Sequence, residues 1–209
     1  VMQILNEASL ENTVYCVDIG QNQMFSAQML ILKRNQKFLT SGGLAPMGYA
    51  MPIAIGASFG CEHTKSIIAI TGDGGFHMSL QSLGVIAQYN LPIQIIVLNN
   101  KSLGMIVQFQ DLYFGGRQVA TTKEGGYQVP GLEEIANAYN IEYRLIEEKN
   151  INDLKDIKNK KGPVIYNVVI EEKTFVSPKL EVNQPLENMN PKLDEKELNE
   201  IIKRASKHK

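Results

Sequence analysis

Two short runs of β-branched hydrophobic residues stand out from the alternation of apolar and polar positions along the chain. Residues 67–70 and 93–98 are mostly apolar, and each run ends abruptly in small polar residues. Between the runs, hydrophobic side chains recur at helical spacing: Phe76, Leu80, Leu83, Ile86 and Ala87. This pattern predicts a strand, a helix and a second strand. A right-handed crossover would make the two strands parallel, so the residues that follow them would meet at one edge of a sheet.

The same periodicities continue on both sides of this unit. Apolar runs predict further strands at residues 13–19, 38–40, 143–146 and 164–170. Helical spacing predicts helices at residues 1–9, 47–60, 103–114, 132–139 and 151–157. Residues 118–130 lack periodicity and predict a mobile loop. Because strands and helices alternate, we expect an α/β fold with a doubly wound, mostly parallel sheet and helices on both faces.

The composition changes after Glu171, where prolines and asparagines accumulate and periodicity is lost. Asp194 and Glu197 have the spacing of a capping box ahead of a short apolar stripe, which predicts a terminal helix. We therefore expect a main domain over residues 1–175 and a tail with a short helix over residues 176–209. The chain starts without an initiator methionine and enters a predicted helix at once, as a piece of a longer polypeptide would.

Composition and charge narrow the class of protein. The 209 residues carry a formal net charge of −1, and 44% of them are hydrophobic. The chain can therefore build a full core, and it has no basic excess that would favour nucleic acid or an anionic membrane as a partner. No apolar run is long enough to span a bilayer, and no leader pattern is present. We expect a cytoplasmic protein in which Cys16 and Cys61 are reduced core thiols.

The polar residues after the two central strands are candidates for metal binding. Asp73, with glycines on both sides, follows the first strand, and Asn99-Asn100 follows the second. Carboxylate and amide oxygens suit Mg²⁺, which usually shares its coordination shell with phosphate. A Gly-Asp-Gly turn can also serve the chain geometry alone, but the asparagine pair at the matching strand end favours a site. The chain contains neither the dinucleotide fingerprint nor the P-loop motif.

The spacing of these residues resembles a known cofactor motif. Gly72-Asp73-Gly74, followed after 24 residues by Asn99-Asn100, is similar to the thiamine diphosphate motif. The likeness extends to four segments that resemble the C-terminal cofactor domain of acetolactate synthases: residues 17–24 (VDIGQNQM), 41–57 (SGGLAPMGYAMPIAIGA), 89–100 (YNLPIQIIVLNN) and 103–117 (LGMIVQFQDLYFGGR). It covers roughly residues 1–180.

This resemblance implies a set of ligands for Mg²⁺ and for the diphosphate of the cofactor. Oxygen atoms of three residues would hold the metal: the side chains of Asp73 and Asn100 and the backbone carbonyl of Ser102. A glycine-rich turn would let the backbone approach the diphosphate: Gly72, Gly74 and Gly75. Two amides would reach it from the neighbouring strand end: Gln21 and Asn22. The family commonly has His at the second of these positions, so Asn22 departs from the pattern.

The resemblance also implies contacts around the rest of the cofactor: Gly43, Leu44, Met47, Gly48, Leu103, Gly104 and Met105. Met47 would hold the cofactor in its bent conformation, although a methionine can equally be a core filler. Met105 is open to the same two interpretations. Phe109 stands where acetolactate synthases carry a Trp that shapes the substrate pocket, and it can also be an ordinary core aromatic. We interpret His77 as a solvated or helix-starting residue rather than an acid–base group.

No catalytic residue of the family falls within this chain. The activating glutamate would come from the pyrimidine-binding domain of a second subunit, in a homodimer or tetramer. FAD, where the full-length enzyme uses it, would bind mainly in a middle domain. Neither domain has a counterpart in this sequence, so the chain alone is expected to be inactive.

The expected function is that of a transferase in branched-chain amino acid biosynthesis. The full-length carboligase would decarboxylate a 2-oxo acid such as pyruvate and transfer the hydroxyethyl unit to a second 2-oxo acid. Three alternatives stay open: a sister 2-oxo-acid decarboxylase or pyruvate oxidase, a stand-alone half-enzyme subunit, and a binding domain that has lost catalysis. Asp73 and Asn100 argue against the last, because a decayed site has no reason to keep metal ligands at this spacing.

Overall fold

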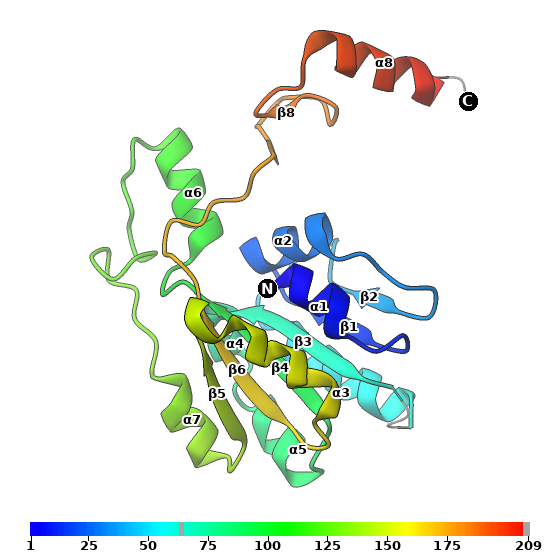
Figure 1. The fold of residues 1–209 in the computed structure, drawn as a ribbon. Helices are drawn as coiled ribbons and strands as arrows, with labels where there is room; N and C mark the ends of the chain where they lie inside the picture. Colours follow the sequence, from blue (N-terminus) through cyan, green and yellow to red (C-terminus); the bar gives the residue numbers. More distant parts are fainter. Residues whose placement is uncertain (63–64, 207–209) are drawn as a thin grey trace. The chain divides into compact units, whose positions relative to one another are not determined.

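The computed structural model describes residues 1–62 and 65–206 and divides into two units, Val1–Thr174 and Phe175–Lys209. The first unit contains a sheet of six parallel strands in the order β2-β1-β3-β4-β6-β5 (Figure 1). The bounds are β1 Val14–Val17, β2 Lys37–Leu39, β3 Ile67–Gly72, β4 Ile93–Asn99, β5 Glu142–Ile146 and β6 Val164–Val169. The α/β fold predicted from the sequence is confirmed.

Helices cover both faces of this sheet, because alternate strand residues point to opposite sides. The helices are α1 Met2–Ala8, α2 Gln21–Met29, α3 Ala50–Gly60, α4 Asp73–Met78, α5 Ser82–Gln88, α6 Gly104–Tyr113, α7 Leu132–Ala138 and the 3₁₀ helix η1 Glu148–Asn159. In β3, Ile67 and Ala69 belong to one hydrophobic cluster, with α3, α5 and α7, whereas Ile68 and Ile70 belong to another, with α1 and η1. The inner strands β1, β3, β4 and β6 are therefore buried on both faces, as parallel strands with helical crossovers usually are, whereas the edge strands β2 and β5 are partly exposed.

The order of the strands sets the place of a ligand site. From β1 the chain passes to β2 on one side and then to β3 on the other, so the direction of winding reverses between β1 and β3. Open α/β sheets bind ligands at the carboxyl ends of the strands beside such a switch point. The residues that follow β1, β3 and β4 are thus the first candidates for a site.

Two predicted helices differ in the structure, and a third helix was not predicted. The segment between β3 and β4 forms two short helices, α4 and α5, instead of one, because glycines and serines of low helix propensity surround the break at Ser79. Helix α2, which begins at the polar residues Gln21 and Asn22, was not predicted, because this segment shows no hydrophobic stripe. The helix predicted over residues 151–157 is a longer 3₁₀ helix, with non-helical dihedral angles at Asn150. The Asn150 side chain accepts a hydrogen bond from the Glu147 N–H at 2.7 Å, and this capping interaction favours the kink.

The second unit contains a small hairpin and a helix. Strands β7 Lys179–Leu180 and β8 Met189–Asn190 pair in antiparallel fashion, which the sequence analysis did not predict. Helix α8 Glu195–Ser206 confirms the predicted terminal helix. The Asp194 carboxylate caps it by accepting a hydrogen bond from the Lys196 N–H at 2.9 Å.

The environments of the two cysteines differ. Cys16 lies in β1 and is fully buried, as predicted, whereas Cys61 ends helix α3 and is only partly buried, so the expectation of two core thiols is wrong for Cys61. Across residues 1–62 and 65–206, no helix combines the length and the apolarity needed to cross a membrane.

Candidate functional site

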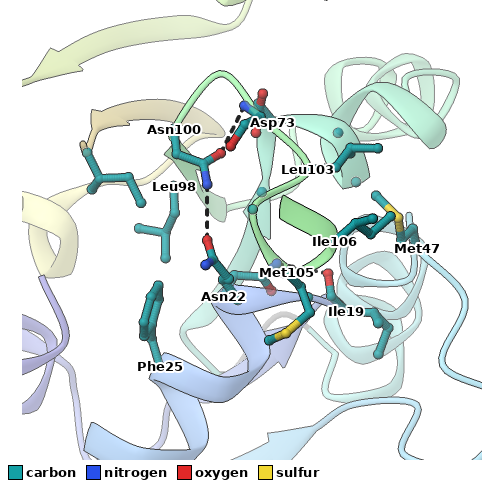
Figure 2. Close-up of a pocket in the computed structure, with 18 residues that line it drawn as sticks. Ile19, Asn22, Phe25, Met47, Asp73, Leu98, Asn100, Leu103, Met105 and Ile106 are labelled. Carbon is teal, nitrogen blue, oxygen red and sulfur yellow. Dashed lines mark hydrogen bonds between the residues drawn. The ribbon is translucent and has the colours of Figure 1, made fainter. Parts of the chain in front are cut away.

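Asp73 and Asn100 line one pocket at the switch point of the sheet. Gly72 and Leu98 are paired in the register of β3 and β4, so the polar residues that follow them emerge at the same edge. Figure 2 shows the side chains of Asp73 and Asn100 at one end of this pocket, with Met47 and Ile106 on another side. The convergence predicted from the two strand ends is therefore present.

Most of the residues predicted for the cofactor line this pocket: Gln21, Asn22, Met47, Gly72, Asp73, Gly74, Gly75, Asn100, Ser102, Leu103, Gly104 and Met105. Others were missed, and most of them are apolar: Ile19, Gly20, Phe25, Leu98, Ile106 and Ile170. Their signal in the sequence is only that they adjoin the polar strand ends. The cavity measures about 70 Å³, whereas pockets that enclose a whole ligand measure roughly 300 Å³ or more. The first unit thus surrounds only part of a ligand of cofactor size.

Asn100 is held from both sides by hydrogen bonds. Its Nδ2 donates to Gln21 Oε1 at 3.1 Å, and its Oδ1 accepts from the backbone N–H of Ser102 at 3.2 Å. These bonds connect the end of β4 with the first residue of α2. Because an amide oxygen has two lone pairs, Asn100 Oδ1 keeps one for a cation.

Several buried polar atoms around the pocket have no partner among the described residues. Gln21 Nε2 and Ser102 Oγ are donors of this kind. Buried donors without a partner are costly, so they indicate an acceptor-rich ligand such as a phosphate. Asn22 differs, because its Nδ2 donates to the Ile19 carbonyl at 3.0 Å while its Oδ1 is the atom without a partner. One of the two Nδ2 hydrogens of Asn22 is thus used, and the other stays for a phosphate.

Asp73 provides a buried carboxylate at the start of α4, with only 1% of its surface exposed. Burial raises the pKa of this carboxyl group to about 6, although hydrogen bonds from the Tyr127 hydroxyl and from backbone N–H groups lower the pKa. Tyr127 Oη donates to Asp73 Oδ2 at 3.0 Å. Burial and the neighbouring carboxylate together raise the pKa of Tyr127, so its hydroxyl stays protonated as the donor. A carboxylate in this environment gains from a bound cation, because the cation neutralises a charge that water cannot reach.

Two glycines let side chains approach the site more closely than any other residue would. A Cβ atom on Gly74 would lie 2.7 Å from Leu103 Cδ2 and 3.2 Å from Met47 Cε. A Cβ atom on Gly104 would collide with the side-chain amides of Gln21 and Asn100. The glycines are therefore needed for the close approach of these side chains.

Met47 is placed in the pocket by the buried carboxylate of Asp18, which the sequence analysis did not single out. Asp18 Oδ1 accepts a hydrogen bond from the Gly48 N–H at 2.9 Å, and Oδ2 accepts bonds from the Ala50 N–H at 3.2 Å and from Thr71 Oγ1 at 3.0 Å. These bonds tie the segment that carries Met47 to the ends of β1 and β3. A carboxylate at the end of an apolar strand was the only signal for this role.

Other predicted residues lie outside the pocket. Gly43 and Leu44 are exposed, and 95% of the Leu44 surface is accessible. The ring of Phe109 packs on that of Tyr113 with centroids 4.6 Å apart and is 42% exposed, so it is not a core aromatic. His77 lies in the last turn of α4, half-buried, and burial lowers its pKa. The expectation of a solvated or helix-starting His77 is therefore wrong.

None of the described residues form a cluster of three or more His, Cys, Asp or Glu side chains that could hold a metal. The oxygens at this site are of mixed kind, because only one of the predicted ligands is a carboxylate. Such a set suits Mg²⁺ when an anionic ligand completes the shell, and it does not suit Zn²⁺, which prefers nitrogen and sulfur.

Comparison with known proteins agrees with this geometry. Residues 18–168 match the sequence model of the family described as "Thiamine pyrophosphate enzyme, C-terminal TPP binding domain". The chain belongs to this family of thiamine pyrophosphate enzymes. The matched residues include the ends of β3 and β4 and the residues that follow β1, whereas Ile170 lies just beyond the match.

Its relatives confirm the resemblance to acetolactate synthases. The chain is 38% identical over 180 residues to the "Probable acetolactate synthase large subunit" of Methanococcus aeolicus, covering 85% of this chain and 29% of that protein. It is 36% identical over 213 residues to the protein of the same description from Methanocaldococcus jannaschii (97% and 35%), and 33% identical over 180 residues to the "Acetolactate synthase isozyme 2 large subunit" of Escherichia coli (85% and 32%). The chain thus spans about a third of the length of these curated relatives.

Proposed function

We propose that this chain is the thiamine-diphosphate- and Mg²⁺-binding domain of an acetolactate synthase-like carboligase. The observation that carries the proposal is the convergence of Asp73 and Asn100 with the unpartnered donors of Gln21 and Ser102 at the switch point of the sheet. Membership of the thiamine pyrophosphate enzyme family supports the cofactor. The similarity to acetolactate synthase large subunits supports the class of reaction.

The residues of this chain bind and orient the cofactor. Mg²⁺ would be held by the Asp73 carboxylate, the Asn100 side-chain oxygen and the Ser102 carbonyl, since hard cations prefer oxygen ligands. The diphosphate would lie against the backbone of residues 72–75, within reach of Gln21 Nε2 and Ser102 Oγ. When bound, thiamine diphosphate supplies the electron sink that allows a 2-oxo acid to lose carbon dioxide.

Apolar side chains of the pocket would shield the cofactor from water. Met47 lines the cavity from one segment, and Leu103 and Met105 line it from the start of α6. Met47 would support the bent conformation of the cofactor. Gly43 and Leu44 would contact its pyrimidine ring from the exposed segment before Met47. Phe109 would lie near the second substrate, on the outer face of α6.

The activity belongs to the full-length protein, in the cytoplasm. It would decarboxylate pyruvate or a similar 2-oxo acid and transfer the hydroxyethyl unit to a second 2-oxo acid, in branched-chain amino acid biosynthesis. A glutamate from the pyrimidine-binding domain of a second subunit would activate the cofactor in a homodimer or tetramer. FAD, if used, would bind mainly in the middle domain, and the isolated chain would be inactive.

Removal of the Asp73 carboxylate tests the metal site directly. In the full-length protein, Asp73→Ala should abolish Mg²⁺-dependent binding of thiamine diphosphate, measured by titration calorimetry. The matched control is Asp153→Ala, which removes an exposed carboxylate on η1 and should leave the affinity unchanged. An affinity of Asp73→Ala equal to that of the wild type would remove the metal-site assignment.

The products formed from pyruvate test the reaction class. The full-length enzyme should release acetolactate. Acetaldehyde, acetyl phosphate or peroxide in its place would favour a sister decarboxylase or pyruvate oxidase. A separately encoded pyrimidine-binding partner would instead favour a half-enzyme subunit.

A further inference from the structure

Tyr127 reaches the candidate metal site from a loop that the family motif does not include. Its hydroxyl donates a hydrogen bond to Asp73 Oδ2 at 3.0 Å, across 54 positions of the sequence. The other hydrogen bonds to the Asp73 carboxylate come from the backbone N–H groups of Asp73 and Gly74, so Tyr127 is the partner that is distant in the sequence. A phenol has a single proton to donate, so Tyr127 binds Oδ2 alone and makes no hydrogen bond to Oδ1.

The loop that carries Tyr127 is tied to the rest of the site by its backbone. We call residues 118–127 the strap. The Leu103 N–H donates to the Thr121 carbonyl at 2.9 Å, which attaches the strap to the start of α6. Within the strap, the Tyr127 N–H donates to the Thr122 carbonyl at 2.8 Å, and the Ala120 N–H donates to the Gly125 carbonyl at 2.7 Å.

Side chains anchor the strap along α6 as well. Thr121 Oγ1 donates to Gln110 Oε1 at 2.8 Å, and Gln118 Nε2 donates to Asp111 Oδ1 at 2.7 Å. Thr121 and Thr122 are buried. These hydrogen bonds fix the backbone of the strap and thereby the position of the Tyr127 hydroxyl. The lack of periodicity in this part of the sequence does not reveal this.

The glycine after Asp73 makes room for the phenol. A Cβ atom on Gly74 would lie 3.1 Å from Tyr127 Oη, which is tighter than ordinary van der Waals contact. The close approach of the hydroxyl to Asp73 thus depends on a residue without a side chain. Asp73 is almost completely buried, so water cannot readily take the place of the Tyr127 hydroxyl as a hydrogen-bond donor.

We propose that Tyr127 is a positioning residue that fixes the orientation of the Asp73 carboxylate for Mg²⁺. The hydrogen bond to Oδ2 fixes the orientation of the carboxylate before the metal binds. Oδ1 then coordinates Mg²⁺, and no side-chain entropy of Asp73 is lost in that step. Groups that hydrogen-bond a metal ligand in this way orient it and raise metal affinity. This inference rests on the proposed function, because it requires Mg²⁺ to bind at Asp73.

The test compares Tyr127→Phe with the wild type in the full-length protein. Phenylalanine keeps the ring and removes only the hydroxyl. With thiamine diphosphate present in excess, titration calorimetry with Mg²⁺ should show a dissociation constant raised about tenfold. The stoichiometry of binding should not change. A purely structural role would instead lower the fraction of protein that binds and leave the affinity of that fraction unaltered.

A matched control removes a tyrosine hydroxyl at the opposite edge of the sheet. Tyr89 follows α5 and precedes β4, and its ring is in edge contact with Phe59. Tyr89→Phe should bind Mg²⁺ as the wild type does. The metal-binding step can then be compared between two variants that differ only in the position of the lost hydroxyl.

The outcomes separate this inference from the proposed function. If the wild type shows no Mg²⁺-dependent binding of the cofactor, the proposed function itself fails. If the wild type binds and Tyr127→Phe binds equally well, the positioning role is wrong. Tighter binding by Tyr127→Phe would also overturn it, because the hydroxyl would then compete with the metal for Asp73.

Discussion

The Asp18 carboxylate accepts a hydrogen bond from the backbone N–H of Gly48 at 2.9 Å. This bond joins the end of β1 to the residue beside Met47, although 30 positions separate the two residues in the sequence. Gly48 has a φ of +85°, a conformation that glycine adopts without strain. The carboxylate therefore fixes a turn that determines where Met47 enters the pocket.

We expect Asp18→Ala to destabilise the carboxyl ends of β1 and β3. The substitution leaves the N–H groups of Gly48 and Ala50 buried without their acceptor, whereas the Thr71 hydroxyl keeps the Gly72 carbonyl at 3.1 Å. Leaving buried donors unpaired should lower the local opening free energy by about 3 kcal/mol. Hydrogen exchange of peptides from β1 and β3, followed by mass spectrometry, measures this change in the intact protein.

Two further variants complete that experiment. Asp18→Asn keeps one acceptor oxygen and should cost less than Asp18→Ala. Asp153→Ala removes an exposed carboxylate and should change exchange by less than about 0.5 kcal/mol. Exchange in β1 and β3 that is equal in Asp18→Ala and Asp153→Ala would show that Asp18 does not tie these strands together.

A second prediction contrasts two glycines that lie in helices. A Cβ atom on Gly104 would collide with the amides of Gln21 and Asn100, whereas a Cβ atom on Gly56 in α3 meets nothing within 4 Å. Because both amides are ends of side chains, they can shift, so Gly104→Ala should fold but bind thiamine diphosphate and Mg²⁺ at least tenfold more weakly. Titration calorimetry on the full-length protein measures the loss.

Gly56→Ala is the matched control for this variant. It should leave the affinity unchanged and stabilise α3 by about 0.5–1 kcal/mol, since glycine is unfavourable in a helix interior. Hydrogen exchange of α3 peptides reports this gain. Equal affinities for the two alanine variants would contradict the role given to Gly104.

The buried thiol of Cys16 leads to a prediction about pH. Burial raises the pKa of Cys16 to about 12, with a smaller contribution from Cys61. In the folded protein the Cys16 thiol should therefore resist alkylation at mildly alkaline pH, whereas the partly buried Cys61 should react. Peptide mass spectrometry after labelling, with and without denaturant, distinguishes the two residues.

The sign of the effect on stability follows from the same shift. The folded state binds the Cys16 proton more tightly than the unfolded state does, so this contribution is complete below about pH 9. It is lost as the pH rises from there towards 12. Labelling of Cys16 in the native protein as fast as that of Cys61 would contradict this account.

The centre of the sheet could be predicted because β3 and β4 are largely apolar runs that end at Gly72 and Asn99. In β3, all four residues from Ile67 to Ile70 are buried, which is the signature of a parallel strand covered on both faces. The break between α4 and α5 could not be predicted from hydrophobic spacing. Phe76 in α4 and Leu83 in α5 belong to the same hydrophobic cluster, and one continuous helix would place them there as well.

The site was predictable where chemistry and strand ends coincide. Asp73 and Asn100 follow directly after their strands, so topology alone brings them to one edge. Tyr127 and Asp18 were missed for different reasons. Tyr127 comes from a loop without periodicity, and its contact with Asp73 depends on backbone hydrogen bonds that leave no pattern in the sequence. Asp18 is close in the sequence to predicted site residues. Its hydrogen bonds to Gly48 and Ala50 depend on the tertiary fold, so the sequence does not indicate them.

Gly74 has a consequence for how this site can change during evolution. A side chain at this position would meet Leu103, Tyr127 and Met47, which come from three segments far apart in the sequence. All three contacts are with the ends of side chains, so a substitution at position 74 would displace them together rather than one at a time. The residues at positions 47, 74, 103 and 127 therefore constrain one another, and a change at one of them alters which residues the other three can accept.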